Sequence, residues 1–215
     1  MSKIIATNED NMLMMARYPD NYFDLAIVDP PYGIGADKEK HSGDTKTWKG
    51  KTEKGYISKQ WDSKIPTKEY FLELKRISKN QIIWGANYFG LIGGYIFWNK
   101  KETMPTYSKG ELAWTSLFLR CDLVELLWAG YKKCEKTNRI HPTQKPVKLY
   151  EWLLMNYAKE GDKIVDTHRG SASLDIACHN LNFDLVTCEL DTDYFNDGNK
   201  RLKQHQNQQV INFEL

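Results

Sequence analysis

The sequence lacks any hydrophobic run that approaches the ~18 apolar residues of a membrane helix. It also lacks an N-terminal segment of signal-peptide character, an internal repeat and a low-complexity tract. Its formal net charge of +2 is too close to zero to indicate a partner, although a balanced total can still contain a local basic patch. These absences predict a cytoplasmic protein with no membrane partner.

Cysteine is scarce and scattered, and the glycine motif of dinucleotide-binding folds is missing. Cys121, Cys134, Cys178 and Cys188 form no C-x-x-C pair and do not have the spacings of zinc ligands. We therefore expect reduced thiols and no metal site. The absence of G-x-G-x-x-G disfavours a nicotinamide oxidoreductase.

Strand-like and helix-like segments alternate along the chain. The apolar runs 23–28, 80–86, 111–120 and 183–190 are typical of strands, and residues 67–78, 147–158 and 191–206 of helices. Residues 122–130 fit either a strand or a helix. The alternation predicts an α/β fold in one domain over residues 1–215, with a mostly parallel, doubly wound sheet.

One of these strands ends abruptly in the sequence FDLAIVDPPYGIG. After Val28 come Asp29, Pro30, Pro31 and Tyr32, and proline has no N–H to give to a sheet. A carboxylate, a stiff turn and an aromatic ring therefore stand at the carboxyl end of a buried strand, where open α/β sheets bind ligands. A strand-ending turn with an Asp cap would satisfy the same pattern.

A second strand ends at Asp166 and leads into a turn of small residues, Gly170 to Ser173, before a helix. Small residues let a ligand approach the backbone, and a helix N-terminus offers free N–H groups. Glu189 stands nineteen residues after Gly170, a spacing that suits an acid on a ribose diol. The pattern predicts a cofactor pocket, although an ordinary strand–turn–helix corner also fits it.

Four motifs in one order, DPPYG, HPTQKP, VDTHRGSAS and CELD with Tyr194 after it, resemble those of DNA adenine-N6 methyltransferases. The catalytic motif precedes the cofactor loop, which is similar to the permuted beta class of S-adenosylmethionine-dependent amino-methyltransferases found in phages and mobile elements. The resemblance spans about Lys3 to Lys203. It implies a Rossmann-like fold of seven strands with one antiparallel edge strand, S-adenosylmethionine as cofactor and a bacterial or phage-encoded protein. DNA, most simply double-stranded, is the implied partner, and a homodimer is compatible with the class.

The resemblance also assigns roles to residues. The catalytic group is Asp29, Pro30, Pro31 and Tyr32: the Asp29 carboxylate and the Pro30 carbonyl would accept the two N–H bonds of the adenine amino group, and Tyr32 would stack on the base. Because a base inside a duplex is out of reach, we expect it to flip out. The implied cofactor contacts are Asp10, Asp29, Thr143, Lys145, Asp166, His168, Gly170, Ser171 and Glu189.

Two residues depart from the family's loop. Ala172 adds a methyl group where glycine is usual, and Arg169 places a charge beside the cofactor or in solvent. A catalytically silent nucleic-acid-binding homologue therefore remains an alternative. The same chemistry on RNA adenine or on cytosine N4 is another, although Asp29 favours adenine because cytosine-N4 enzymes of this class tend to have Ser there.

Residues 33–66 and 98–142 have the composition of insertions that contact DNA. Nine lysines stand against four acids between Lys38 and Lys68, with Trp48, Tyr56 and Trp61 interleaved. A basic loop after the catalytic turn is suited to gripping phosphates. A solvated surface loop with ordinary lysines is the alternative.

Overall fold

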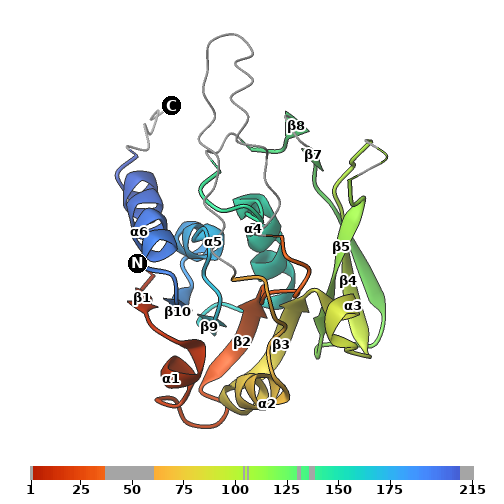
Figure 1. The fold of residues 1–215 in the computed structure, drawn as a ribbon. Coiled ribbons are helices and arrows are strands. Elements are labelled where there is room, and N and C mark those ends of the chain that lie inside the picture. The colour runs from red at the N-terminus through yellow and green to blue at the C-terminus, as the bar shows by residue number, and fades with distance from the viewer. Residues whose placement is uncertain are drawn as a thin grey trace.

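A computed structural model describes residues 2–36, 61–103, 105, 107–129, 132–135 and 139–208 of the chain. In this part, one sheet of eight strands runs through the molecule and helices cover both of its faces (Figure 1). The strands of the sheet are β1 (Ile4–Asn8), β2 (Phe23–Val28), β3 (Ser78–Trp84), β4 (Gly94–Asn99), β5 (Gly110–Thr115), β6 (Cys121–Glu125), β9 (Lys163–Asp166) and β10 (Asp184–Glu189). The helices are α1 (Asn11–Met15), α2 (Lys68–Ile77), α3 (Ala86–Phe89), α4 (Val147–Tyr157), α5 (Ser173–Leu181) and α6 (Thr192–Gln206). A separate small antiparallel pair joins β7 (Trp128–Ala129) and β8 (Lys132–Lys133).

The strand order is β1-β10-β9-β2-β3-β5-β4-β6. The first five strands are parallel, β5 is antiparallel to both of its neighbours, and β6 is parallel to β4. The predicted α/β fold with a mostly parallel sheet is confirmed. The prediction of seven strands with an antiparallel edge strand is wrong, because β6 joins β4 as an additional strand and β5 inserts between β3 and β4.

Strand β2 is buried on both sides, which explains its continuous apolar sequence. Leu25 and Ile27 face a core cluster that contains α4 and α5, whereas Ala26 and Val28 face a cluster that contains α1 and α2. A strand with only one buried face would alternate apolar and polar residues instead. β2 is therefore a fixed central support for the turn that follows it.

The chain connections diverge between β9 and β2. The helices α5 and α6, which follow β9 and β10, lie on one face of the sheet, and α1 and α2, which follow β1 and β2, lie on the other (Figure 1). Such a switch point leaves a crevice at the carboxyl ends of the strands, and ligands bind there in open α/β folds. Asp29 follows β2 on one side of it, and the turn that follows β9 lies on the other.

Most of the predicted elements are present, with small shifts at their ends. Residues 122–130, which fitted a strand or a helix, contain the end of β6 and then β7. The segment 98–142, which was predicted to contain a DNA-contacting insertion, contributes β5 and β6 to the main sheet. Only the loops of this segment therefore remain as candidates for an insertion. The lysine-rich stretch 37–60, with Trp48 and Tyr56, lies outside the described residues. Among the described helices, none has the length and apolar character that crossing a membrane requires.

Candidate active site

Two segments that are distant in the sequence, the loop before α4 and strand β5, converge on the turn after β2. The Lys145 Nζ, from the loop before α4, lies 2.5 Å from Asp29 Oδ2 and 2.9 Å from Oε2 of Glu111 on β5. The Lys145 side chain is only 3% exposed. Burying an ammonium is costly unless it is paired, and here one lysine pairs with two carboxylates.

Tyr32 completes this cluster. Its hydroxyl donates to Asp29 Oδ1 at 2.6 Å and lies 3.3 Å from Glu111 Oε2. Its ring stacks on Tyr88 of α3, with centroids 4.8 Å apart and planes at 16°. Gly85 makes room for the ring: its φ is +81°, and a Cβ there would lie 2.4 Å from Tyr32 Cε1. Glycine is therefore required at position 85 both for its backbone and for its lack of a side chain.

The two carboxylates of the cluster have pKa values shifted in opposite directions. Burial raises the pKa of Asp29, and the charge of Glu111 raises it further, against the opposing effect of Lys145. Burial also acts to raise the pKa of Glu111, but Lys145 and Lys100 together outweigh it and lower that pKa to about 2. Two carboxylates whose environments separate their pKa values are suited to different roles.

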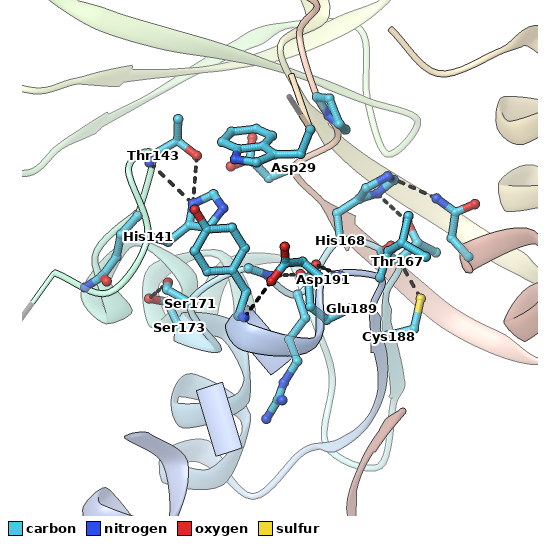
Figure 2. Close-up of a pocket in the computed structure, with 18 of the residues that line it drawn as sticks. Asp29, His141, Thr143, Thr167, His168, Ser171, Ser173, Cys188, Glu189 and Asp191 are labelled. Atoms are coloured by element: carbon cyan, nitrogen blue, oxygen red, sulfur yellow. Dashed lines mark hydrogen bonds between the residues drawn. The ribbon is translucent and has the colours of Figure 1, made fainter. Parts of the chain in front are cut away.

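The turn after β9 forms the other wall of the site. Gly170 N–H donates to Glu189 Oε2 at 2.8 Å, and Asp191 N–H donates to Glu189 Oε1 at 2.9 Å. These two bonds fix the Glu189 carboxylate at the end of β10, beside the cavity (Figure 2). Asp166 lies behind this wall, where its Oδ1 accepts from His168 N–H at 2.9 Å.

His168 is a neutral side chain held by its neighbours. Asn11 Nδ2 lies 3.1 Å from Nε2, and Thr167 Oγ1 lies 3.0 Å from Nδ1. Since the Asn11 amide nitrogen can only donate, the network assigns the ring proton to Nδ1. Burial lowers the pKa of His168 to about 3, so the ring carries no charge near neutral pH.

The Arg169 side chain is fully buried, so the prediction that its charge lies in solvent is wrong, although Arg169 is among the residues that line the larger of the two cavities described below. Its guanidinium is buried and pairs with Asp175 of α5, with Nε 2.9 Å and Nη2 2.8 Å from Oδ2. Nη1 also donates to the Phe195 carbonyl of α6 at 3.2 Å. The charge ties the turn to two helices.

Ala172 adopts the left-handed conformation that is usual for glycine, with φ 58° and ψ 32°. We expect Ala172→Gly to change the unfolding free energy by less than about 1 kcal/mol. It would relieve about 1–2 kcal/mol of backbone strain but lose a buried methyl group, about 0.8 kcal/mol, and make the unfolded chain more flexible, a further 0.4–1 kcal/mol or so.

Urea unfolding would measure this, with Ala177→Gly as the matched control. Ala177 is equally buried within α5 and its backbone is helical, so that variant loses a methyl group without any strain relief. We expect Ala177→Gly to destabilise the protein by about 2 kcal/mol. Equal losses in the two variants would show that Ala172 is not strained.

A chain of hydrogen bonds that no sequence motif indicated joins the turn to the Lys145 backbone. Ser173 Oγ donates to the Lys145 carbonyl at 2.8 Å. Arg201 of α6 donates to the Ser171 carbonyl at 2.7 Å and to Ser173 Oγ at 2.8 Å. No local sequence signal marks Arg201, because α6 otherwise reads as a polar surface helix.

Two cavities meet at this cluster. The larger has a volume of about 790 Å³ and the smaller about 400 Å³, and both are lined by Asp29, Pro31, Trp61, Thr143 and Lys145. The larger brings together eight of the residues predicted to bind a cofactor: Asp10, Asp29, Thr143, Lys145, His168, Gly170, Ser171 and Glu189. The smaller brings together the four predicted catalytic residues, Asp29, Pro30, Pro31 and Tyr32. Asp166 is not among the lining residues of either cavity.

The lining residues that were not predicted from the sequence include three with side chains able to contact a ligand. Glu111 and Tyr88 line the smaller cavity, and His141 lines the larger one, where its ring lies 4.4 Å from that of Tyr194. Asp10 has a further role as the N-cap of α1, where it accepts from Met12 N–H at 2.8 Å. In the described part of the chain, no group of three or more His, Cys, Asp or Glu side chains is arranged to hold a metal ion.

The chain is similar to known DNA methylases. Residues 113–200 match the DNA methylase family of N6 and N4 methyltransferases. The type II methyltransferase M.HpaI of Haemophilus parainfluenzae is 35% identical over 69 residues, which are 32% of this chain and 22% of that protein. The type II methyltransferase M2.DpnII of Streptococcus pneumoniae is 23% identical over an alignment that covers 94% of this chain and 90% of that protein.

Solved structures share the fold at low sequence identity. The M1.HpyAVI–SAM complex has a TM-score of 0.58 and 18% identity, covering 93% of this chain and all of that one. The PvuII DNA methyltransferase, which is cytosine-N4-specific, has a TM-score of 0.60 and 13% identity, covering 100% and 89%. The predicted relationship to DNA methyltransferases and the Rossmann-like fold are both confirmed.

Proposed function

We propose that this chain, which is related to the DNA methylases that modify exocyclic amino groups, transfers a methyl group from S-adenosylmethionine to N6 of adenine in DNA. One observation carries the proposal: a cofactor-sized cavity and a base-sized cavity meet at the Asp29 carboxylate. A methyl donor in one and an amino group in the other would then face each other across that residue. Holding two reactants in such a geometry is a large part of catalysis.

The larger cavity has the chemistry that S-adenosylmethionine requires. Its volume lies within the range of about 300–1,000 Å³ that is usual for cofactor sites. The Glu189 carboxylate, fixed by two backbone N–H groups, suits a ribose diol. Thr143, His168, Gly170 and Ser171 would line the rest of the molecule. When bound, the cofactor supplies an electrophilic methyl group.

The smaller cavity has the chemistry that a flipped adenine requires. The adenine amino nitrogen is a weak nucleophile because the ring delocalises its lone pair. Acceptors on its two N–H bonds, the Asp29 carboxylate and the Pro30 carbonyl, would hold that nitrogen toward the methyl donor, and the two prolines keep the acceptors preorganised. Tyr32 would stack on the base, and a base can enter such a pocket from a duplex only by flipping out.

Entry of the base would change the hydrogen bonds of the turn. The Tyr32 hydroxyl occupies Asp29 Oδ1, which is one of the acceptor oxygens that the amino group needs. The incoming amino group would either share that oxygen with the hydroxyl, since a carboxylate oxygen has two lone pairs, or displace it and free Tyr32 to contact the base. Asp29 at the first position of the turn favours adenine over cytosine, since the cytosine-N4 enzymes of this class tend to have Ser there.

The test is an analysis of nucleosides from methylated DNA. Purified protein would be incubated with S-adenosylmethionine and unmethylated duplex DNA, and the digested product separated by mass spectrometry. We expect N6-methyladenine well above an Asp29→Ala control that still binds the cofactor. N4-methylcytosine would change the assigned base, and a methylated product only with RNA would change the substrate. Cofactor binding without any methylated base would contradict the proposal.

A further inference from the structure

Glu111 is a partly buried carboxylate in the base-sized cavity that has no assigned role. It lies on β5, the one antiparallel strand of the described sheet, and its side chain is 22% exposed. Its Oε1 pairs with Lys100, and its Oε2 lies 2.9 Å from Lys145 Nζ and 3.3 Å from the Tyr32 hydroxyl. A side chain fixed at both oxygens by two lysines has little freedom to contact a substrate directly.

Asp29 and Glu111 are placed for different roles. Asp29 lines both cavities, whereas Glu111 lines the smaller one and is held from outside by Lys100. In methyl transfer the N–C bond would form as the C–S bond of the methyl donor breaks, with that electron pair going to sulfur. The amino nitrogen then loses a proton whose bonding electrons return to nitrogen. The group that takes this proton must have spare basicity, which a carboxylate paired with two ammonium groups does not have.

We propose that Glu111 is a positioning residue that acts as the permanent counter-ion of Lys145, holding this ammonium against Asp29 and leaving Asp29 to accept the proton of the substrate amino group. The inference rests on the proposed function. It assigns the role of Glu111 through Lys145, since no contact between Glu111 and the reacting atoms is needed. The opposite shifts in the pKa values of the two carboxylates agree with this division.

The charge environment of Asp29 makes a direct test feasible. Asp29 interacts electrostatically with charged and titratable groups from several elements. These are Lys145 and Glu111, Tyr32 on the same turn as Asp29, Tyr150 of α4 and Asp166 of β9. Burial is the largest cause of the raised Asp29 pKa, and the negative charge of Glu111 raises this pKa further. Removing the Glu111 charge while keeping its shape should therefore make Asp29 more acidic.

The first experiment needs no substrate. In protein with ¹³C-labelled aspartate carboxyl groups, the Asp29 signal would be assigned with Asp29→Asn and titrated by NMR in wild type and in Glu111→Gln. We expect the midpoint of Asp29 to fall by about one pH unit in the variant, as removal of a nearby like charge predicts. Glu73→Gln is the matched control, because Glu73 is also 22% exposed and pairs with Arg76 on α2, away from the site. An unchanged Asp29 midpoint in Glu111→Gln would overturn the inference.

The second experiment measures methyl transfer across pH. For Glu111→Gln we expect kcat to fall about 10- to 100-fold, as misplacement of a catalytic group does. KM for DNA and Kd for S-adenosylmethionine should stay within about twofold of wild type, because removing an interaction that counts mainly in the transition state lowers kcat rather than binding. The acidic limb of the kcat profile should move to lower pH together with the Asp29 midpoint. A loss of kcat without this shift would make Glu111 merely structural and would overturn the inference, as would unchanged kcat.

A second variant covers the case in which Glu111→Gln folds poorly. Lys100 is absent from the residues that line either cavity, and Lys100→Gln leaves the Glu111 charge in place while removing its outer partner. We expect a severalfold fall in kcat with no fall in the Asp29 midpoint. If wild type methylated no nucleobase, the proposed function would fail, and the NMR titration would still decide the relation between Glu111 and Asp29.

Discussion

Replacing Lys145 with methionine is expected to lower methyl transfer by at least about 100-fold, the scale on which removal of one preorganised electrostatic group acts. Methionine preserves much of the side-chain volume but removes the ammonium that joins Asp29 and Glu111. Two carboxylates would then remain buried near each other without a shared cation. Like charges at such a site disfavour ionisation of one member, and Asp29, whose pKa is already raised, is the member that would take up a proton. A protonated Asp29 can no longer accept a proton from the substrate.

Single-turnover methyl transfer across pH would test this prediction. Because the Asp29 pKa rises further in Lys145→Met, its acidic limb should move to higher pH, opposite in direction to Glu111→Gln. Lys79→Met is the control, since Lys79 forms an exposed pair with Asp24 at the other end of β2. A variant that kept the wild-type rate would show that Lys145 does not organise the acceptor.

The same substitution should also lower stability. Removing one partner of a buried ion pair leaves an uncompensated charge and costs about 3–5 kcal/mol. The sign of the pH dependence follows from the raised Asp29 pKa: the folded variant binds a proton more readily than the unfolded chain does, so the deficit should shrink as pH falls. Urea unfolding at two pH values would detect this trend.

The cofactor and catalytic motifs could be read from the sequence because each is local. Asp29 follows Val28 directly, and Glu189 ends the strand that follows the small-residue turn. In a parallel sheet, strand ends of this kind meet at one edge. The alternation of strands and helices therefore predicted the fold class, whereas most of the predicted residues that line the two cavities were assigned by the resemblance of the motifs to those of DNA adenine-N6 methyltransferases.

Glu111 could not be found in this way. It stands 79 residues after Tyr32, and its place in the cavity depends on β5 inserting between β3 and β4. The sequence gives β5 an apolar pattern but says nothing about which strands flank it. The prediction of an antiparallel edge strand was wrong for the same reason, and it left Glu111 with no expected neighbours.

The position of the Arg169 charge could not be predicted from the sequence for a different reason. A cation in a glycine-type loop suggested a place beside the cofactor or in solvent, since a buried arginine needs a partner that no local motif indicates. That partner, Asp175, lies six residues later in the first turn of α5, and the third contact comes from the Phe195 carbonyl of α6. Only the packing of two helices against the turn brings these groups together.

Breaking the Arg169–Asp175 pair is expected to destabilise the protein by about 3–5 kcal/mol, because both side chains are fully buried and either one left alone is an unpaired charge. Asp175→Asn preserves shape and removes one charge, and Arg169→Met removes the other. Replacing both residues by apolar ones, Arg169→Met with Asp175→Leu, should recover much of the loss, since a buried pair often contributes little over an apolar replacement. We therefore expect the effects of the two substitutions on the unfolding free energy to be strongly non-additive.

Urea unfolding of the two single variants and the double variant would measure this coupling, with Glu125→Gln as control. Glu125 pairs with Lys101 at the surface, where both side chains are nearly half exposed, and its loss should cost less than about 1 kcal/mol. The single variants should also bind S-adenosylmethionine more weakly, because Arg169 anchors the turn that carries Gly170 and Ser171. If Asp175→Asn were as stable as wild type, the buried pair would not be what holds this turn. Weaker cofactor binding at unchanged stability would instead mean that Arg169, which also lines the larger cavity, acts on the cofactor directly.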